Sequence, residues 1–570
     1  MSGKIGNKGR ILVGERVLAR LRARGVDWLF ANAGTDHAPL IEGLSRAPAT
    51  GLDLPEAMVV AHEHVAVAMA HGAWLATGRP QAVLVHVNVG LANALMGIIN
   101  AARDNVPMVI LSGRTPITET ARHGHRQLPI HWGQEMRDQG AMLREVVKWD
   151  YELRYGDEVD VTIDRAMAIA MSEPRGPVYL SLPREVLAEE TGRSADPSPI
   201  QQPARPFRPD HASIEEVADL LAAAENPVLI AARSADAPGA EALAELAEKA
   251  ALPVVEFWPS RLSLGTGHPM HGGFDPAPWL EKADLVLVLD AMVPWLPWMH
   301  EVKKGAKIVQ IGADPLFSPM PIRGFPAHIA LAGETSSTLS AIARAVGERT
   351  DGKRLAKRRK AVADAGKQRE KDIAGRIREG ARAPMTQAWA SHCIGEAVRD
   401  IKGAAIVSEL ACQPENMHLA GPGSYFSHSL AGGLGWGVPA ALGLKLADPD
   451  RLVIAATGDG SWLFANPLVC HQIAAAQNLP IVTILFNNGV WNAVRKTTGM
   501  MYPAGAALKA NRTPLTSLAP HPDYVAVAKA SGAWARRVED GNDLPKILEK
   551  AIRQVTEKKR PAFVEIMTEA

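Results

Sequence analysis

Short apolar segments recur along the whole chain, and they constrain its fold more than any other feature. Their apolar residues follow one another directly, without the alternation typical of a strand with one face in water. Strands of this kind are buried on both faces, as in parallel sheets that are covered by helices. The clearest segments are 82–87, 108–112, 178–182, 227–232, 254–258, 284–290, 307–311, 404–408, 452–456, 481–486 and 562–567.

Helical patterns lie between these segments. Alternation of buried strands and helices is typical of α/β proteins whose parallel sheets have helices on both faces. We therefore predict doubly wound, mainly parallel-sheet α/β domains. The clearest helical stretches are 63–76, 91–103, 214–223, 240–250, 439–446 and 544–555.

Two stretches interrupt the alternation and indicate domain boundaries. Residues 191–210 are rich in Pro and polar residues and have no periodicity, which predicts a linker. Residues 349–384 are dense in Lys, Arg and Glu, which predicts a solvated helix or tether. The chain is thereby divided into three predicted α/β domains, at 1–190, 211–348 and 384–570.

The charge balance and the cysteines exclude several classes of protein. Lys and Arg total 62 and Asp and Glu total 61, so the net charge is +1 and gives no support for a nucleic-acid or membrane-surface partner. We expect no secretory signal, because residues 1–10 contain no apolar stretch, and no transmembrane helix, because no apolar run reaches about 18 residues. Its three cysteines form no CxxC pair, so no zinc site is expected. We expect a cytoplasmic protein.

One motif points to chemistry. The apolar segment 452–456 is followed by GDGS at 458–461, and the segment 481–486 is followed by NNG at 487–489. Glycines let backbone N–H groups approach an anion, and the helix that follows points its N-terminus at that anion. Carboxylate, amide and carbonyl oxygens are ligands for a hard divalent cation. The pair of strand ends therefore predicts a site for Mg²⁺ and a diphosphate.

A GDG followed after about two dozen residues by NN resembles the fingerprint of the thiamine diphosphate (ThDP) enzymes. The resemblance covers nearly the whole chain and is closest to the acetolactate synthase and benzoylformate decarboxylase group. It implies a pyrimidine-binding, a central and a diphosphate-binding domain, in the order of the three predicted domains. It also implies Mg²⁺ ligands at Asp459, Asn488 and the carbonyl of Val490, and diphosphate contacts from Gly458, Gly460, Ser461, Asn488, Ala411 and Cys412.

Two further segments resemble this family. In 425–441, YFSHSLAGGLGWGVPAA, the bulky residue after two glycines is Leu434, which by resemblance props the cofactor into a V shape. In 62–80, HEHVAVAMAHGAWLATGRP, Glu63 stands where the family has its catalytic glutamate. That carboxyl exchanges a proton with N1′ of the aminopyrimidine, for which a dry pocket is suited. The alternative for Glu63 is a solvated residue in the first turn of a helix.

His86 lies near the carboxyl end of the segment 82–87, where α/β sheets place their ligands. Benzoylformate decarboxylase has an active-site histidine at the corresponding interval after its glutamate, so the resemblance implies a catalytic role; a buried core histidine is the alternative. Thr35 occupies a pocket-lining position of the family and is a second candidate. His37 and Asp36 are additional polar candidates, and an Asx-type turn is an equal alternative for Asp36.

Other polar and aromatic residues stay open. Acetolactate synthases use a glutamine after the third strand, so Gln127 or Gln134 could serve similarly, among histidines whose spacing suggests no metal site. Trp295 and Trp298 follow the segment 284–290, and packing explains at least one of them.

The sequence as a whole predicts a ThDP- and Mg²⁺-dependent lyase or transferase. The leading interpretation is a 2-oxo acid decarboxylase or an acetolactate-synthase-like carboligase that also uses an aldehyde or ketone. The alternatives are a 2-hydroxyacyl-CoA lyase, against which weighs our expectation that no C-terminal lid follows the segment 562–567, and a non-catalytic ThDP-binding subunit. FAD is not expected, because residues 232–234 lack a Gly-rich turn. In the family, the glutamate and the GDG loop meet across a subunit interface, which implies a homodimer or homotetramer.

Overall fold

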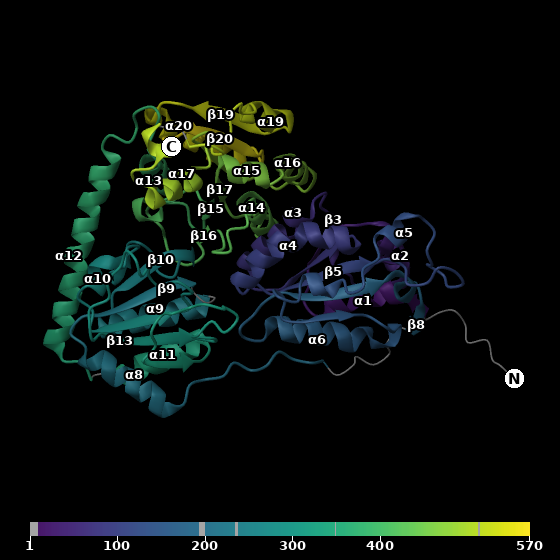
Figure 1. Ribbon diagram of the computed structural model, residues 1–570, viewed down its shortest axis with the longest axis horizontal. Coiled ribbons are helices and arrows are strands. Elements are labelled where there is room, and N and C mark those ends of the chain that lie inside the picture. The colour runs from purple at the N-terminus through teal and green to yellow at the C-terminus, as the bar shows by residue number, and fades with distance from the viewer. Residues whose placement is uncertain (1–9, 193–199, 234–236, 348, 511–512) are drawn as a thin grey trace. The chain divides into compact units, whose positions relative to one another are not determined.

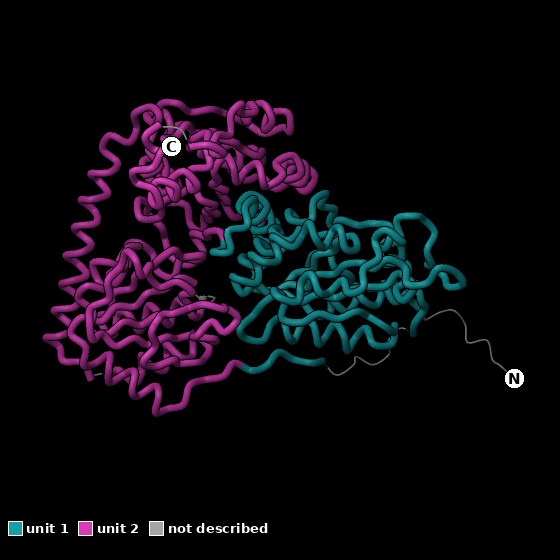
Figure 2. The backbone as a smooth tube through the Cα atoms, viewed as in Figure 1, with its two compact units in different colours: residues 1–205, 429–448 teal, residues 206–428, 449–570 magenta. Residues whose placement is uncertain are grey.

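The computed structural model describes residues 10–192, 200–233, 237–347, 349–510 and 513–570. The chain divides into two compact units (Figure 2). Unit 1 consists of Met1–Arg205 and Ser429–Asp448, and unit 2 consists of Pro206–His428 and Pro449–Ala570. Both units contain mainly parallel sheets with helices between the strands, which confirms the predicted α/β fold class.

Unit 1 contains a six-stranded parallel sheet, of which β3 and β5 are labelled in Figure 1. The strand order is β3-β2-β4-β5-β7-β6. Its strands are β2 (Trp28–Asn32), β3 (Glu56–Val59), β4 (Gln81–Val85), β5 (Met108–Arg114), β6 (Asp150–Glu152) and β7 (Val178–Pro183), and a separate antiparallel ribbon pairs β1 (Arg10–Leu12) with β8 (Glu190–Gly192). The helices of residues 1–205 are α1 (Val13–Ala23), η1 (Thr35–His37), α2 (Ala38–Thr50), α3 (Glu63–Thr77), α4 (Val87–Arg103), α5 (Ile130–Gly133), η2 (Gly140–Met142), η3 (Gly156–Glu158), α6 (Val159–Met171) and α7 (Arg184–Leu187).

Helix α14 (Gly437–Ala447) belongs to unit 1 although it lies far along the chain. It packs on α3, and two glycines allow the backbones to approach closely. A Cβ atom on Gly72 would lie 1.9 Å from the carbonyl oxygen of Ala440, and one on Gly443 would lie 2.0 Å from that of Met69. Because of this contact, α3 is buried on nearly every side.

Unit 2 contains one long sheet in the order β14-β13-β12-β9-β10-β16-β15-β17-β18-β20-β19, with β11 beside β10. Its strands are β9 (Pro227–Arg233), β10 (Val254–Arg261), β11 (His271–Gly273), β12 (Leu285–Leu289), β13 (Lys307–Gly312), β14 (Ile329–Ala332), β15 (Ala405–Glu409), β16 (Tyr425–Ser427), β17 (Val453–Gly458), β18 (Val482–Asn487), β19 (Trp534–Val538) and β20 (Ala562–Met567). All neighbours are parallel except β10 and β16, which meet through a single antiparallel pair, Arg261 and Phe426. Separate apolar cores lie on the two sides of this junction.

The helices of unit 2 connect these strands. They are α8 (His211–Ala223), α9 (Ala237–Ala250), α10 (Ala277–Leu280), α11 (Thr335–Val346), α12 (Gly352–Ile377), α13 (Gln387–Val398), η4 (Pro414–Asn416), α15 (Asp459–Phe464), α16 (Pro467–Ala476), α17 (Asn492–Met501), α18 (Ala506–Lys509), α19 (Tyr524–Ala530), η5 (Gly541–Asp543) and α20 (Leu544–Thr556). Within the described ranges, no helix is both long and apolar enough to cross a membrane.

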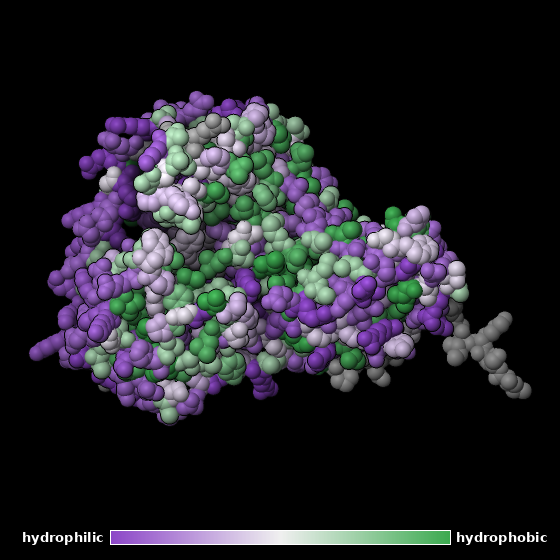
Figure 3. Space-filling view, in the orientation of Figure 1, coloured by the Kyte–Doolittle hydropathy of each residue, from purple (hydrophilic) through white to green (hydrophobic). Residues whose placement is uncertain are grey.

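The two interruptions predicted from the sequence have different outcomes. The charged stretch 349–384 contains the long helix α12, and hydrophilic residues cover the edge that it forms (Figure 3). In the predicted linker 191–210, residues 200–210 form no helix or strand, and 193–199 lie outside the described residues. The boundaries of the three domains stay a prediction, since the compact units divide the chain differently.

Candidate active site

Three neighbouring strands of unit 2 bring the predicted cofactor residues to one edge of the sheet. Strand β17 pairs in parallel with β15 on one side and with β18 on the other. Parallel neighbours end at the same edge, so the residues that follow them lie close together. Ala411 and Cys412 follow β15, Asp459 follows β17, and Asn488 follows β18.

Asp459 is the first residue of α15 and is almost completely buried. Its Oδ1 accepts a hydrogen bond from the Gly460 N–H at 2.9 Å, and its Oδ2 accepts one from the Gly489 N–H at 2.7 Å. Burial raises the pKa of this carboxyl, and the backbone hydrogen bonds counteract the shift only in part. Among the residues that the structure describes, no cationic side chain forms an ion pair with Asp459. A buried carboxylate without a positive partner is suited to a cation.

The two asparagines at the end of β18 differ in their hydrogen-bond partners. Asn488 Oδ1 accepts a hydrogen bond from the Val490 N–H at 3.1 Å, whereas Asn487 Nδ2 donates to Glu565 Oε1 at 2.8 Å and so holds β18 to β20. A Cβ atom on Gly460 would lie 2.2 Å from the Trp491 ring, so a larger residue fits there only if the ring or the backbone shifts.

The remaining contacts of the edge come from the backbone and from a buried thiol. Cys412 donates its N–H to Ser408 Oγ at 3.0 Å, and burial raises the pKa of its thiol to about 12, so the thiol stays neutral. Ala411 is fully buried, and Ser461 is also buried, in the first turn of α15. Gly458 has open space around its Cα, where a Cβ atom would meet no neighbour.

In unit 1, Glu63 begins α3 and is 9% exposed. Two amides hold its carboxylate: Asn32 Nδ2 donates to Oε1 at 2.9 Å, and Asn93 Nδ2 donates to Oε2 at 2.5 Å. A Cβ atom on Gly90 would lie 3.2 Å from Oε1. The carboxylate is therefore fixed in position by neutral donors from β2 and α4.

The sequence analysis did not identify Asn93. It lies on α4 in a stripe that repeats at intervals of three and four residues, which places its members on one face of a helix. That face turns toward α3, because a Cβ atom on Gly97 would touch His64 and Val67. Small and amide residues at helical spacing are the signal that could have found this face. The members are Gly90, Asn93, Gly97 and Asn100.

His86 lies between β4 and α4, and its ring contacts two polar side chains. Nδ1 is 2.5 Å from Asp36 Oδ1, and Nε2 is 3.0 Å from the side-chain amide of Gln134. The hydrogen bond with Asp36 raises the pKa of His86, although burial opposes the shift. The structure thus brings together three residues that the sequence analysis named separately.

The remaining unit 1 candidates lie around this group. Thr35 is exposed, and its carbonyl accepts a hydrogen bond from Arg184 Nη1 at 3.2 Å. His37 is completely buried, its Nδ1 accepts the Gly34 N–H at 3.0 Å, and burial lowers its pKa. His37 thus holds the backbone of the loop at Gly34 in place.

Leu434 is half-buried in a loop of unit 1. Asn100 holds this loop through the N–H and the carbonyl oxygen of Gly433. Asn100 Nδ2 donates to the carbonyl oxygen at 2.8 Å, and Oδ1 accepts the N–H at 3.1 Å. The loop that carries Leu434 is therefore anchored to α4.

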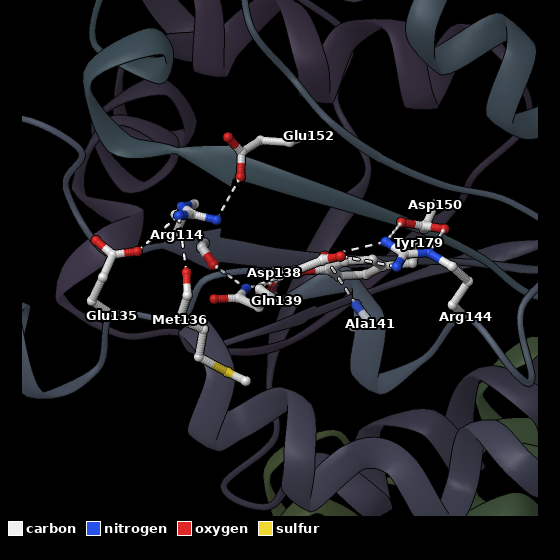
Figure 4. A network of polar contacts seen from close by, with 12 residues as sticks. Arg114, Glu135, Met136, Asp138, Gln139, Ala141, Arg144, Asp150, Glu152 and Tyr179 are labelled. Atoms are coloured by element: carbon white, nitrogen blue, oxygen red, sulfur yellow. Dashed lines mark hydrogen bonds and ion pairs between the residues drawn. The ribbon is translucent and has the colours of Figure 1, made fainter.

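The segment that carries Gln134 is held by a network of polar contacts at the end of β5 (Figure 4). Arg114 donates to Glu135 Oε1 at 2.8 Å, to the Met136 carbonyl at 3.2 Å and to Glu152 at 2.9 Å. Gln139 donates to Ser112 Oγ at 2.7 Å. These contacts hold the residues that directly follow Gln134.

The other open candidates are more ordinary. Gln127 is exposed, and it donates its backbone N–H to His131 Nδ1 at 3.0 Å. No group of three or more His, Cys, Asp or Glu suited to a metal occurs in the described part of the chain. Trp295 is buried against Phe325, whereas Trp298 is 70% exposed.

Comparison with known proteins identifies the family. Three models of thiamine pyrophosphate enzymes match, namely the N-terminal TPP binding domain at residues 11–142, the central domain at 214–342 and the C-terminal TPP binding domain at 411–566. Benzoylformate decarboxylase of Pseudomonas aeruginosa is 29% identical to this chain, covering 96% of it and 97% of the relative. The acetolactate synthase large subunit of Haemophilus influenzae is 24% identical, covering 97% and 93%.

The solved structures agree. The thiamine diphosphate-dependent 4-hydroxybenzoylformate decarboxylase of Rhodococcus jostii RHA1 has a TM-score of 0.77 at 25% identity, covering 98% of this chain and 99% of that one. The fold indicates a class of protein, the α/β enzymes whose ligand sites lie at the carboxyl ends of parallel strands. The chain belongs to the thiamine pyrophosphate enzyme family, which confirms the resemblance and the ThDP cofactor, and it is an enzyme rather than a non-catalytic subunit.

Proposed function

We propose that this enzyme uses ThDP and Mg²⁺ to cleave or form the C–C bond next to the carbonyl of a 2-oxo acid. Either the acid is decarboxylated, or the fragment that remains is joined to an aldehyde or ketone. The similarity to a benzoylformate decarboxylase and an acetolactate synthase over nearly the whole chain supports this range of reactions. We also propose the three domains as 1–190, 211–348 and 384–570, and the cytoplasm as the location.

The observation that carries the proposal is the buried carboxylate of Asp459, which forms no ion pair with a Lys or Arg of the described residues. Its neighbours supply the other oxygens that Mg²⁺ prefers, the side-chain oxygen of Asn488 and the carbonyl of Val490. Gly458, Gly460 and Ser461 at the start of α15 would hold the diphosphate together with Asn488, and Ala411 and Cys412 would contribute from the end of β15. Because the Trp491 ring lies where a Cβ atom of residue 460 would be, this position offers its backbone to a ligand rather than a side chain.

When bound, ThDP supplies the nucleophilic carbon and the electron sink for the loss of CO₂. The protein supplies position and proton transfer. Glu63, held by Asn32 and Asn93, would exchange a proton at its carboxylate with N1′ of the aminopyrimidine. Leu434, on the loop that Asn100 anchors, would support the cofactor conformation.

His86 would move a proton to or from groups that derive from the substrate, and Thr35 would contact the substrate from its exposed position. We assign His37 a positioning role, because both of its ring nitrogens lie against backbone N–H groups, those of Gly34 and Gly113. We further propose a homodimer or homotetramer of the 61.0 kDa chain. Light scattering checks the assembly, and a fully active monomer would contradict it.

The function is tested by measuring CO₂ release and carboligation from a panel of aromatic and aliphatic 2-oxo acids, with and without ThDP and Mg²⁺. We expect turnover of at least one acid that is lost when either cofactor is withheld. Absence of cofactor-dependent turnover across the panel, in protein that binds ThDP by calorimetry, would contradict the proposal.

A further inference from the structure

We propose that Asp36 is a positioning residue that fixes the tautomer of His86, so that Nε2 alone exchanges protons, and that Gln134 is the resting partner of Nε2. This inference rests on the proposed role of His86 in proton transfer. All three residues belong to unit 1.

The partners of Asp36 determine which nitrogen of His86 is protonated. Its side chain is 2% exposed, and an ionised carboxylate only accepts hydrogen bonds. Oδ1 lies 2.5 Å from His86 Nδ1, whereas Oδ2 accepts the Val87 N–H at 3.2 Å and lies 3.1 Å from His37 Nε2. His86 Nδ1 must therefore carry a proton, which leaves Nε2 as the only ring atom that can gain or lose one.

The surrounding backbone leaves no room for another arrangement of the Asp36 carboxylate and the His86 ring. A Cβ atom on Gly113 would lie 1.5 Å from Asp36 Oδ2, and one on Gly34 would lie 2.0 Å from His86 Nδ1. Two strand ends thus approach the pair so closely that the carboxylate and the ring cannot turn away from each other. Such over-determined geometry is typical of pre-organised sites.

The other partner of His86, the Gln134 amide, can act as donor or acceptor. The Gln134 amide lies 3.0 Å from His86 Nε2. Its NH₂ group can donate to a neutral ring, and after a half-turn its oxygen can accept from a charged ring. One side chain therefore satisfies both protonation states, while Arg114 holds the adjacent Glu135 in place (Figure 4).

The charges around His86 agree with this division of roles. Burial works against the charge of Asp36, yet the hydrogen bond to His86 and the nearby imidazoles bring its pKa below the ordinary value. Burial lowers the pKa of His37 and of His131, whereas the hydrogen bond with Asp36 raises that of His86, so a positive charge is favoured on His86 over the other two. The titratable and charged groups that face His86 or its carboxylate partner are Asp36, His37, Glu63, His131 and Arg184.

The decisive variant is Asp36→Asn, because its amide has one favourable orientation. The amide oxygen must keep the hydrogen bond from the Val87 N–H, so the NH₂ group faces His86 Nδ1. The neutral ring must then accept at Nδ1 and carry its proton on Nε2, the wrong tautomer. We expect kcat to fall by about 10²–10⁴-fold. Loss of the negative charge also lowers the pKa of His86, which moves the high-pH limb of the rate to lower pH by about 1–3 pH units.

The second measurement does not depend on turnover. In ¹⁵N-histidine-labelled wild-type protein above the pKa of His86, we expect a protonated Nδ1 and an unprotonated Nε2, and the reverse in Asp36→Asn. His86→Gln identifies the signal among the 18 histidines. A wild-type ring with its proton on Nε2 would overturn the inference, even if Asp36→Asn failed to fold.

Two controls separate this role from a structural one. Asp164→Asn breaks a buried ion pair with Arg20 elsewhere in unit 1, and it should lower the melting temperature without moving the pH profile. Gln134→Met should leave the wild-type tautomer in place. An unshifted pH profile in Asp36→Asn, beside normal wild-type turnover, would overturn this inference alone. Absent wild-type turnover would count against the proposed function instead, and the ring tautomer would still be measured.

Discussion

Asp36 in unit 1 and Asp459 in unit 2 are both buried carboxyl groups beyond the carboxyl ends of parallel strands, and their partners differ. Asp36 contacts two imidazole rings, and its pKa lies below the ordinary value. Asp459 accepts two backbone N–H groups and its pKa is raised by burial. In unit 1, therefore, an imidazole supplies the positive charge that balances Asp36. In unit 2, the negative charge of Asp459 is left for a divalent cation to balance.

The largest expected effect tests the unit 2 side of this comparison. Asp459→Ala removes the only acidic ligand of the proposed Mg²⁺ site, so Mg²⁺-dependent ThDP binding should be abolished in calorimetry. Asp450→Ala, an exposed carboxyl of the same unit, should bind as the wild type does. Unchanged ThDP affinity in Asp459→Ala would refute the site.

The next effect separates two residues of unit 1. Glu63→Gln keeps the size of the side chain but cannot exchange a proton, so exchange of the ThDP C2 proton for deuterium should slow by more than about 10²-fold, even without substrate. His86→Ala should leave that exchange nearly intact and lower turnover by about 10²–10⁴-fold. NMR of C2 exchange and steady-state kinetics measure both. If His86→Ala slowed exchange as much as Glu63→Gln, the two roles would be misassigned.

Glu256 on β10 sharpens the comparison, because it is a buried carboxyl with backbone donors but no set of metal ligands. Its Oε1 accepts the N–H groups of Ser263 and Leu264 at 2.5 and 2.8 Å, and burial raises its pKa from 4.5 to about 8. A proton rather than a metal therefore neutralises it. Its contribution to stability is complete below pH 4.5 and is lost as the pH rises to about 8.

Glu256→Gln should remove this pH dependence. The variant and the wild type should be about equally stable at pH 5, whereas at pH 9 the variant should be more stable by up to a few kcal/mol. Urea unfolding at both pH values measures the difference in the free energy of unfolding. A parallel loss of stability in both proteins between pH 5 and 9 would show that another group is responsible.

The smallest effect concerns the backbone at the start of α15. Gly460→Ala places a methyl group 2.2 Å from the Trp491 ring, so either must move, at a cost of about 1–3 kcal/mol. Gly458→Ala meets no atom within 4 Å and should change stability little. Chemical unfolding of the cofactor-free protein compares the two. Equal stability of both variants would mean that Trp491 moves away freely.

Much of the fold could be predicted because buried strands are encoded by local composition. The apolar segment 562–567 coincides with β20, and the segment 481–486 differs from β18 by one residue at each end. Short edge strands such as β3 and β19 were not predicted, because they contain exposed polar residues. An edge strand pairs on one side only, so its sequence needs less apolar surface and gives a weaker signal.

The sequence by itself determined the alternation of buried strands and helices, and the GDG and NN motifs at two strand ends. These are local properties, since a run of apolar residues or a glycine-flanked turn is specified by neighbours along the chain. Only the tertiary structure decided that a backbone hydrogen bond joins Asn488 to Asp459 while the side chain of Asn487 binds Glu565. It also joined Glu63 to Asn93 and His86 to Asp36. Such pairs form across 30–78 residues of sequence, and they depend on which strands and helices become neighbours, a choice made by the packing of the whole unit.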